Sequence, residues 1–155
     1  MLDLETIRRM IAERVPFVRA LDVRIEQVEA TRAVASMPFA VERTNHIGTV
    51  HAAAQFGLAE TVSGVLALAA FADLQQAGYL PVVASASITY RRPAAGDLRA
   101  EATLSADEQA RVRAEIASEG KARYNAQVTI TNADGEVVTE MLVDGALIIP
   151  RERKG

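Results

Sequence analysis

Residues 51–74 read HAAAQFGLAETVSGVLALAAFADL, a run whose only acidic side chains are Glu60 and Asp73. A helix that is apolar on all sides is a buried helix. Glu60 lies near its middle, so its carboxylate leaves water unless a polar site receives it. Desolvation costs several kcal/mol or raises a carboxyl pKa by up to about 3–5 units, and groups under such stress concentrate at functional sites. We therefore expect a central core helix with Glu60 as a functional group.

The composition limits the class of protein. The chain has 155 residues, half of them hydrophobic, which predicts one domain over 1–155 with an ordinary core. It has no cysteine, which excludes disulfides, zinc-thiolate sites and a cysteine nucleophile. A net charge of −3 and the absence of tryptophan argue against a nucleic-acid partner. The sequence contains no phosphate-binding loop, dinucleotide-binding pattern or metal-ligand cluster, so we expect no metal and no separate cofactor.

The chain start is too charged for a signal peptide, and its apolar residues share one helical face. We expect a helix within 1–18 that packs on its own domain, and a short tail at 150–155. The run at 51–74 is long enough to cross a membrane. Its polar residues and its many small residues favour the central helix of a soluble fold instead. We therefore expect a cytoplasmic protein with no membrane partner.

The other segments show apolar and polar residues in alternation, which predicts half-buried strands. The expected strands are 22–29, 31–37, 84–91, 97–104, 123–130 and 137–149. Residues 38–50 are irregular, and Gly78 suits the end of the central helix. Turn signals at 93–96 and 132–135 join consecutive strands, so we expect antiparallel pairing.

One segment has two interpretations. Ser105 to Glu108 reads as a capping box that opens a helix ending at Gly120, whereas 111–116 could instead extend the sheet. We favour the helix over 106–119. The whole pattern predicts an α+β fold in which an antiparallel sheet of five or six strands wraps around one long helix. One sheet covers only part of a helix that is apolar all round, so we expect a homodimer, or a dimer of dimers.

The segment 45–60, NHIGTVHAAAQFGLAE, resembles the signature of hotdog-fold acyl-CoA thioesterases of the phenylacetate-pathway and hydroxybenzoyl-CoA branches. The residues that match in type and spacing are Asn45, Gly48, His51, Phe56, Leu58, Ala59 and Glu60. The stretch 88–98, ITYRRPAAGDL, is similar to the strand-turn-strand that follows the helix in that family. The chain departs from the family at Ala52-Ala53, where many relatives have a glycine pair.

The resemblance implies a hotdog fold and hydrolysis of an acyl-CoA thioester. Glu60 would be a general base or a nucleophile, and the sequence leaves both open. The Ala52 N–H, at the positive end of the helix, would hold the thioester carbonyl. Asn45 would orient the water or the carbonyl from the neighbouring subunit. His51 would hold the thioester or fix the loop, although a histidine that only caps the helix explains it equally well.

The remaining substrate contacts are also implied by the resemblance. Gly48 would shape the loop, and Phe56 and Ser63 would line the acyl pocket. The phosphates of coenzyme A, which is part of the substrate, need cations at the pocket mouth. The candidate cations are Arg91, Arg92, Lys121 and Arg123.

Two other functions stay open. Hydroxyacyl dehydratases of the same fold pair a histidine with a helix carboxylate, and His46 lies fourteen residues before Glu60, a similar spacing. The Phe-Pro-Gly that usually follows that histidine is missing here. A non-catalytic acyl-CoA-binding module would need no Glu60 chemistry at all. The sequence does not specify the acyl group, the pathway, or dimer against tetramer.

Overall fold

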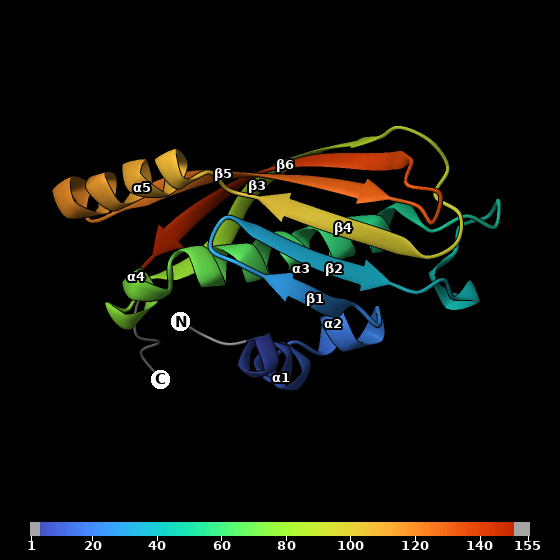
Figure 1. The fold of residues 1–155 in the computed structure, drawn as a ribbon, viewed down its shortest axis with the longest axis horizontal. Coiled ribbons are helices and arrows are strands. Elements are labelled where there is room, and N and C mark those ends of the chain that lie inside the picture. Colours follow the sequence, from blue (N-terminus) through green and yellow to red (C-terminus); the bar gives the residue numbers. More distant parts are fainter. Residues whose placement is uncertain (1–3, 151–155) are drawn as a thin grey trace.

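The computed structural model describes residues 4–150 as one antiparallel sheet in the order β1-β2-β4-β5-β6-β3, with the helix α3 running beneath it (Figure 1). The strands are β1 Arg24–Val28, β2 Arg32–Met37, β3 Leu80–Tyr90, β4 Leu98–Thr103, β5 Ala122–Thr131 and β6 Val137–Ile148. The α+β class, the antiparallel sheet and the long central helix that the sequence predicts are confirmed.

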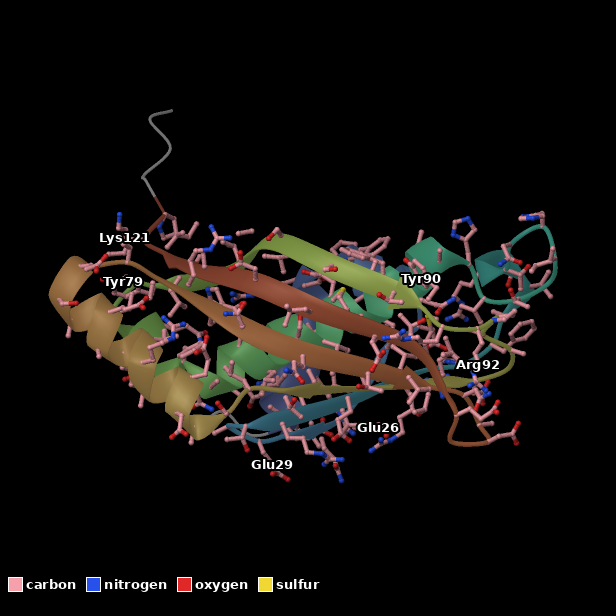
Figure 2. The ribbon with its side chains drawn as sticks, turned by 90° about the horizontal axis from the view of Figure 1, so that it is seen from above. Glu26, Glu29, Tyr79, Tyr90, Arg92 and Lys121 are labelled. Carbon is pink, nitrogen blue, oxygen red and sulfur yellow. The ribbon has the colours of Figure 1, made fainter. Side chains whose placement is uncertain are left out.

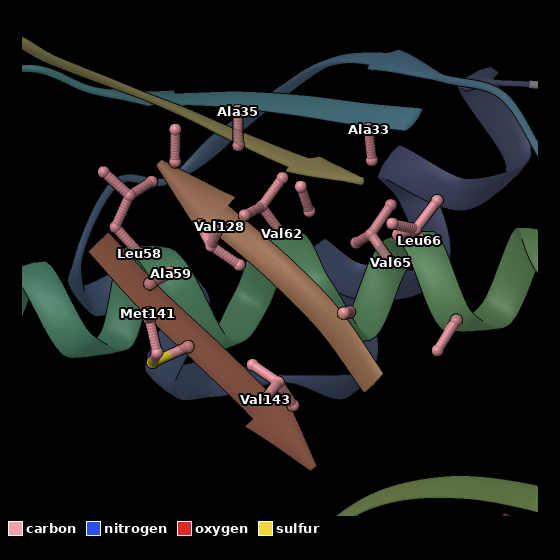
Figure 3. Close-up of a cluster of buried hydrophobic side chains, with 14 of the residues drawn as sticks. Ala33, Ala35, Leu58, Ala59, Val62, Val65, Leu66, Val128, Met141 and Val143 are labelled. Atoms are coloured by element: carbon pink, nitrogen blue, oxygen red, sulfur yellow. The ribbon is translucent and has the colours of Figure 1, made fainter. Parts of the chain in front are cut away.

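The core lies between α3, Ala52–Ala70, and the concave face of the sheet. Leu58, Val62 and Leu66 recur along one face of α3 and are fully buried. They meet very small side chains on the neighbouring strands, among them Ala33 and Ala35 of β2 (Figure 3). These small residues let the helix lie close to the sheet along its length, which holds the helix start in a fixed position.

The N-terminal segment forms two helices, α1 Leu4–Arg14 and α2 Pro16–Ala20. The break falls at Val15, whose non-helical backbone (φ −123°, ψ 83°) agrees with the clash that a proline imposes on a helical residue before it. The α2 helix packs against α3 at Gly57, where an added Cβ would lie 2.4 Å from the Leu21 side chain. Residues 1–3 and 151–155 of the expected domain, which include most of the expected tail, lie outside the described residues.

Two details differ from the sequence prediction. The central helix ends at Ala70 rather than near Gly78, because Phe71 leaves helical geometry and a separate helix α4, Ala72–Gln76, follows. The turn at 93–96 does not close a hairpin. The strands it joins, β3 and β4, lie apart in the sheet, and β3 pairs with β6 at the edge. Residues 91–97 instead cross the end of the sheet, where the Ala94 carbonyl accepts the Val50 N–H.

The ambiguous segment is the helix α5, Ala106–Glu119. The Ser105 side chain accepts the Glu108 N–H at its start, and Gly120 adopts the left-handed conformation at its end. A 3-10 turn, η1, spans Val41–Arg43. In the described part of the chain one helix, α3, is long and apolar enough to cross a membrane, and most of it is buried inside the domain.

Candidate active site

Glu60 lies near the middle of α3, and its side chain is partly buried. Its carboxylate has no hydrogen bond or ion pair with any described residue, in contrast to Asp73, which Arg113 binds at 2.9 Å. Burial raises the pKa of Glu60 above its ordinary value. Neither Glu60 oxygen is fully buried, since the one described side-chain nitrogen or oxygen that is fully buried without a partner is Thr61 Oγ1. Water therefore still reaches the Glu60 carboxylate. A partly desolvated carboxylate that water reaches is suited to accept a proton.

The first turn of α3 offers one free hydrogen-bond donor. The His51 N–H is bound by the Arg43 carbonyl, the Ala53 N–H by the His51 ring and the Ala54 N–H by the His51 carbonyl. Within residues 4–150 the Ala52 N–H has no partner. A helix start carries about half a positive charge, so this N–H is suited to an oxygen that gains negative charge.

His51 is the N-cap of α3, and its Nδ1 accepts the Ala53 N–H at 3.0 Å. In the neutral ring this contact assigns the proton to Nε2, since Nδ1 acts as an acceptor. The capping role considered from the sequence is therefore present. It leaves the Nε2–H of an exposed ring free to donate at the start of α3.

Asn45 organises its own loop. Its side-chain oxygen accepts the Ile47 and Thr49 N–H groups, each at 3.1 Å, and its amide donates to the Thr49 hydroxyl at 2.8 Å. Gly48 completes the turn with a φ of +78°, which a side chain rarely adopts. One amide hydrogen of Asn45 remains unused, and the loop that carries it is adjacent to the start of α3.

Gln55 and Thr139 form a buried polar pair that the sequence analysis missed. Thr139 on β6 donates to the Gln55 side-chain oxygen, and the Gln55 amide donates to the Val50 carbonyl at 2.9 Å. Both residues are buried, Gln55 at 4% and Thr139 at 0% exposed. The pair ties the loop before α3 to the sheet. The isolated glutamine of an apolar helix was the available signal in the sequence.

The other predicted contacts are dispersed. Phe56 is 37% exposed one turn before Glu60, whereas Ser63 is buried and donates to the Glu60 carbonyl, so its hydroxyl serves the helix backbone. Arg91 and Arg92 pair with Glu140 and Glu136 at 2.5 and 2.7 Å. Figure 2 shows Tyr90 and Arg92 toward one end of the sheet and Lys121 at the other.

Only one of these two ends of the sheet lies at the start of α3. The Tyr90 hydroxyl donates to the Ala52 carbonyl at 3.1 Å, so the Arg91–Arg92 end is the end at which α3 begins. Arg123 pairs with Asp144, and together with Lys121 it lines a cavity of about 790 Å³ between α5 and the outer face of the sheet. The four predicted cations therefore form two separate pairs rather than one site.

Comparisons with known proteins agree with this fold. A protein of unknown function from Pseudomonas aeruginosa, described as a probable thioesterase, is 36% identical and superimposes with a TM-score of 0.84 over 94% of this chain and 95% of its own. The PaaI protein from the phenylacetic acid degradation operon of E. coli is 19% identical, with a TM-score of 0.72 over 90% and 89%. A thioesterase from Haemophilus influenzae is 17% identical, with a TM-score of 0.78 over 100% and 96%.

These neighbours are hotdog-fold proteins, so the fold that the sequence resemblance implies is confirmed, as is the resemblance to hotdog thioesterases. A comparison with curated proteins found no match. The family described as a domain of unknown function, DUF4442, matches residues 4–145. Since that match spans nearly the whole described chain, the protein belongs to the DUF4442 family and has the hotdog fold.

Proposed function

We propose that this protein hydrolyses an acyl-CoA thioester to the free acid and coenzyme A. One observation carries the proposal: the core helix presents both an unpartnered carboxylate, Glu60, and an unpartnered first-turn N–H, Ala52. Thioester hydrolysis needs a group that activates water and a donor that holds the oxyanion. The Pseudomonas relative is described as a probable thioesterase, which supports the reaction class.

In the proposed reaction Glu60 acts as the general base. It takes a proton from water, the hydroxide oxygen attacks the thioester carbonyl, and the oxyanion is held by the Ala52 N–H with help from the His51 Nε2–H. Collapse of this intermediate breaks the carbon–sulfur bond, and the thiolate takes up the proton. The raised pKa of Glu60 favours proton uptake and so supports the base role, and a nucleophilic Glu60 is the alternative.

We propose that the working site is built from two copies of the chain. Glu60 lies eight residues after Ala52, about 12 Å along the helix axis. This distance between the base and the oxyanion donor is long for one thioester carbonyl and its attacking water to span. A two-fold axis would instead bring the Ala52 end of one copy, with Asn45, to Glu60 of the other. The edge strand β3, whose residues 82–87 are all exposed, offers a surface for that contact.

The dehydratase alternative requires His46 to work with Glu60. His46 is exposed in the loop before α3, and no hydrogen bond or ion pair joins it to Glu60 among the described residues. Under the thioesterase proposal, His46→Ala keeps most of the hydrolytic activity. A dehydratase would lose its activity with this substitution.

The decisive experiment measures thiol release from a panel of aliphatic and aryl acyl-CoA thioesters by wild type and Glu60→Gln. Loss of a general base lowers the rate by about 10²–10⁴-fold. A Glu60→Gln rate equal to wild type would refute the proposal and leave a binding module as the alternative.

The oxyanion donor can be tested separately with Ala52→Pro. Proline suits the first helical position, and His51 already has the extended backbone (φ −60°, ψ 140°) that a following proline requires. The variant loses the N–H with the helix retained, and we expect kcat to fall by about 10²–10³-fold. The matched control is Ala106→Pro, the same position of α5 after an extended Ser105, which should keep wild-type activity. Equal losses in both variants would contradict the role of Ala52.

A further inference from the structure

A stripe along α3 connects Glu60 with the far end of the helix. Glu60 and Gly64 are four residues apart and share one helical face, and Phe71 is the C-cap residue at the far end of the helix. A Cβ added at Gly64 would meet nothing within 4 Å, so the helix surface next to Glu60 borders open space. The stripe is about 16 Å long from Glu60 to Phe71 by helical rise.

Tyr124 of β5 closes the far end of this stripe. The Tyr124 ring packs on the Phe71 ring with centroids 5.4 Å apart. The Arg113 guanidinium stacks on the Phe71 ring, 5.6 Å from its centroid. Gly145 on the neighbouring strand makes room for the phenol, because a Cβ there would lie 2.0 Å from Tyr124 Cζ. The ring therefore lies over Gly145 of β6, the strand next to the edge strand β3.

The Tyr124 hydroxyl is an unused hydrogen-bonding group. Tyr124 is 2% exposed, and its hydroxyl has no partner among the described residues. Among the described side-chain nitrogen and oxygen atoms, only Thr61 Oγ1 is both fully buried and without a partner. The unpartnered Tyr124 hydroxyl is therefore not fully buried, and it lies at the small part of the residue that remains accessible to water. Burial, and next the charge of Glu60, raise the pKa of Tyr124 to about 12, so it stays a neutral donor.

We propose that the acyl group lies along α3 from Glu60 past Gly64 toward Phe71 and ends at Tyr124, whose hydroxyl donates a hydrogen bond to an oxygen near the acyl tail. This inference rests on the proposed thioesterase function and adds a substrate class to it: acyl groups with a polar end. A plain alkyl tail would displace water from the hydroxyl without replacing its hydrogen bond, and sites built around a polar group discriminate against such analogues.

The test compares matched pairs of substrates, butanoyl-, hexanoyl- and octanoyl-CoA against the same thioesters with a terminal hydroxyl. For the best-fitting length we expect wild type to favour the hydroxylated member by about tenfold in kcat/KM. Tyr124→Phe keeps the ring and its packing, and should bring this ratio to about one. The same ratio in both proteins would overturn the inference.

A second variant tests the path of the chain. Gly64→Leu adds a side chain in open space and replaces a helix-interior glycine, so the helix gains intrinsic stability. It should lower kcat/KM for octanoyl-CoA more than for butanoyl-CoA, and an equal effect on both would place the acyl group elsewhere. If hydrolysis depends on Glu60 but its chain-length and hydroxyl preferences are unchanged by Tyr124→Phe and Gly64→Leu, this inference is overturned and the proposed function stands. If wild type hydrolyses none of the thioesters, the proposed function fails together with it.

Discussion

The Glu60 side chain works, under the proposed function, only while it is ionised. Because burial raises its pKa, we expect kcat/KM to fall on acidification with a midpoint above 4.5, the ordinary glutamate value. The measurement is a pH–rate profile of thiol release from an acyl-CoA with a non-titrating tail. A profile that stays flat down to pH 4.5 would argue against Glu60 as the base. Asp73 is not involved, since its pKa is lowered by Arg113.

The same pKa shift predicts a cost in stability. The folded protein holds the Glu60 proton more tightly than the unfolded chain, so ionisation of Glu60 disfavours folding at pH values above its folded pKa. We expect the Tm of Glu60→Gln relative to wild type to be highest at pH 7–8 and to fall as the pH drops toward 4.5. Thermal scans across this range test the trend, which does not depend on the hydrogen bonds of the new amide. A pH-independent difference would contradict it.

Among single residues, the sequence predicts those whose polarity differs from that of their neighbours in the chain. Glu60 is evident because it interrupts an apolar run, and His51 because it precedes one. Tyr124 is not evident, since an inward tyrosine in an alternating strand is ordinary. Its position depends on Gly145, twenty-one residues later, and pairing between strands is needed to bring the two residues together.

The start of α3 is held by side chains as well as by its own cap. Removing the Thr139 hydroxyl leaves the buried Gln55 oxygen without its donor, and such a loss costs about 1–3 kcal/mol. We therefore expect Thr139→Val to lower the midpoint of urea unfolding at an unchanged slope. Because Gln55 also holds the Val50 carbonyl next to Ala52, kcat should fall more than KM changes.

Thr139→Ser is the matched control, since it keeps the hydroxyl, and it should restore kcat. A variant that loses stability but keeps full kcat would limit this pair to a structural role. The expected coupling can be measured with Gln55→Leu and the double variant, because groups within one hydrogen-bond network lose energy non-additively.

Elements differ in how far the sequence determines them. The helix α5 carries its own start and end signals, Ser105 and Gly120, so local chemistry decides it. The turn at 93–96 has equally good local signals but joins strands that do not pair. The reason is global, since β3 pairs with β6 along ten residue pairs and so takes the edge position. A local turn motif contains no information about that pairing.

For the whole molecule, the surface left uncovered predicts self-association. The edge strand β3 is exposed on both faces, with Val82 and Val83 at 37% and 36%. Exposed strand edges are sites of pairing with a second chain. We expect light scattering at micromolar concentration to give a dimer or a larger even assembly, and a persistent monomer would rule out the shared site.

A shared site also makes two inactive variants complement each other. In a mixed dimer of Glu60→Gln and Ala52→Pro, one of the two sites would combine the intact Ala52 N–H of the first chain with the intact Glu60 of the second. Random mixing of equal amounts would then restore about a quarter of the wild-type sites, because half of the dimers are mixed and each has one intact site. The measurement is thiol release after the two variants are refolded together, with each variant refolded alone as the control. A site contained within one chain would restore no activity, since every chain in the mixture lacks either the base or the donor.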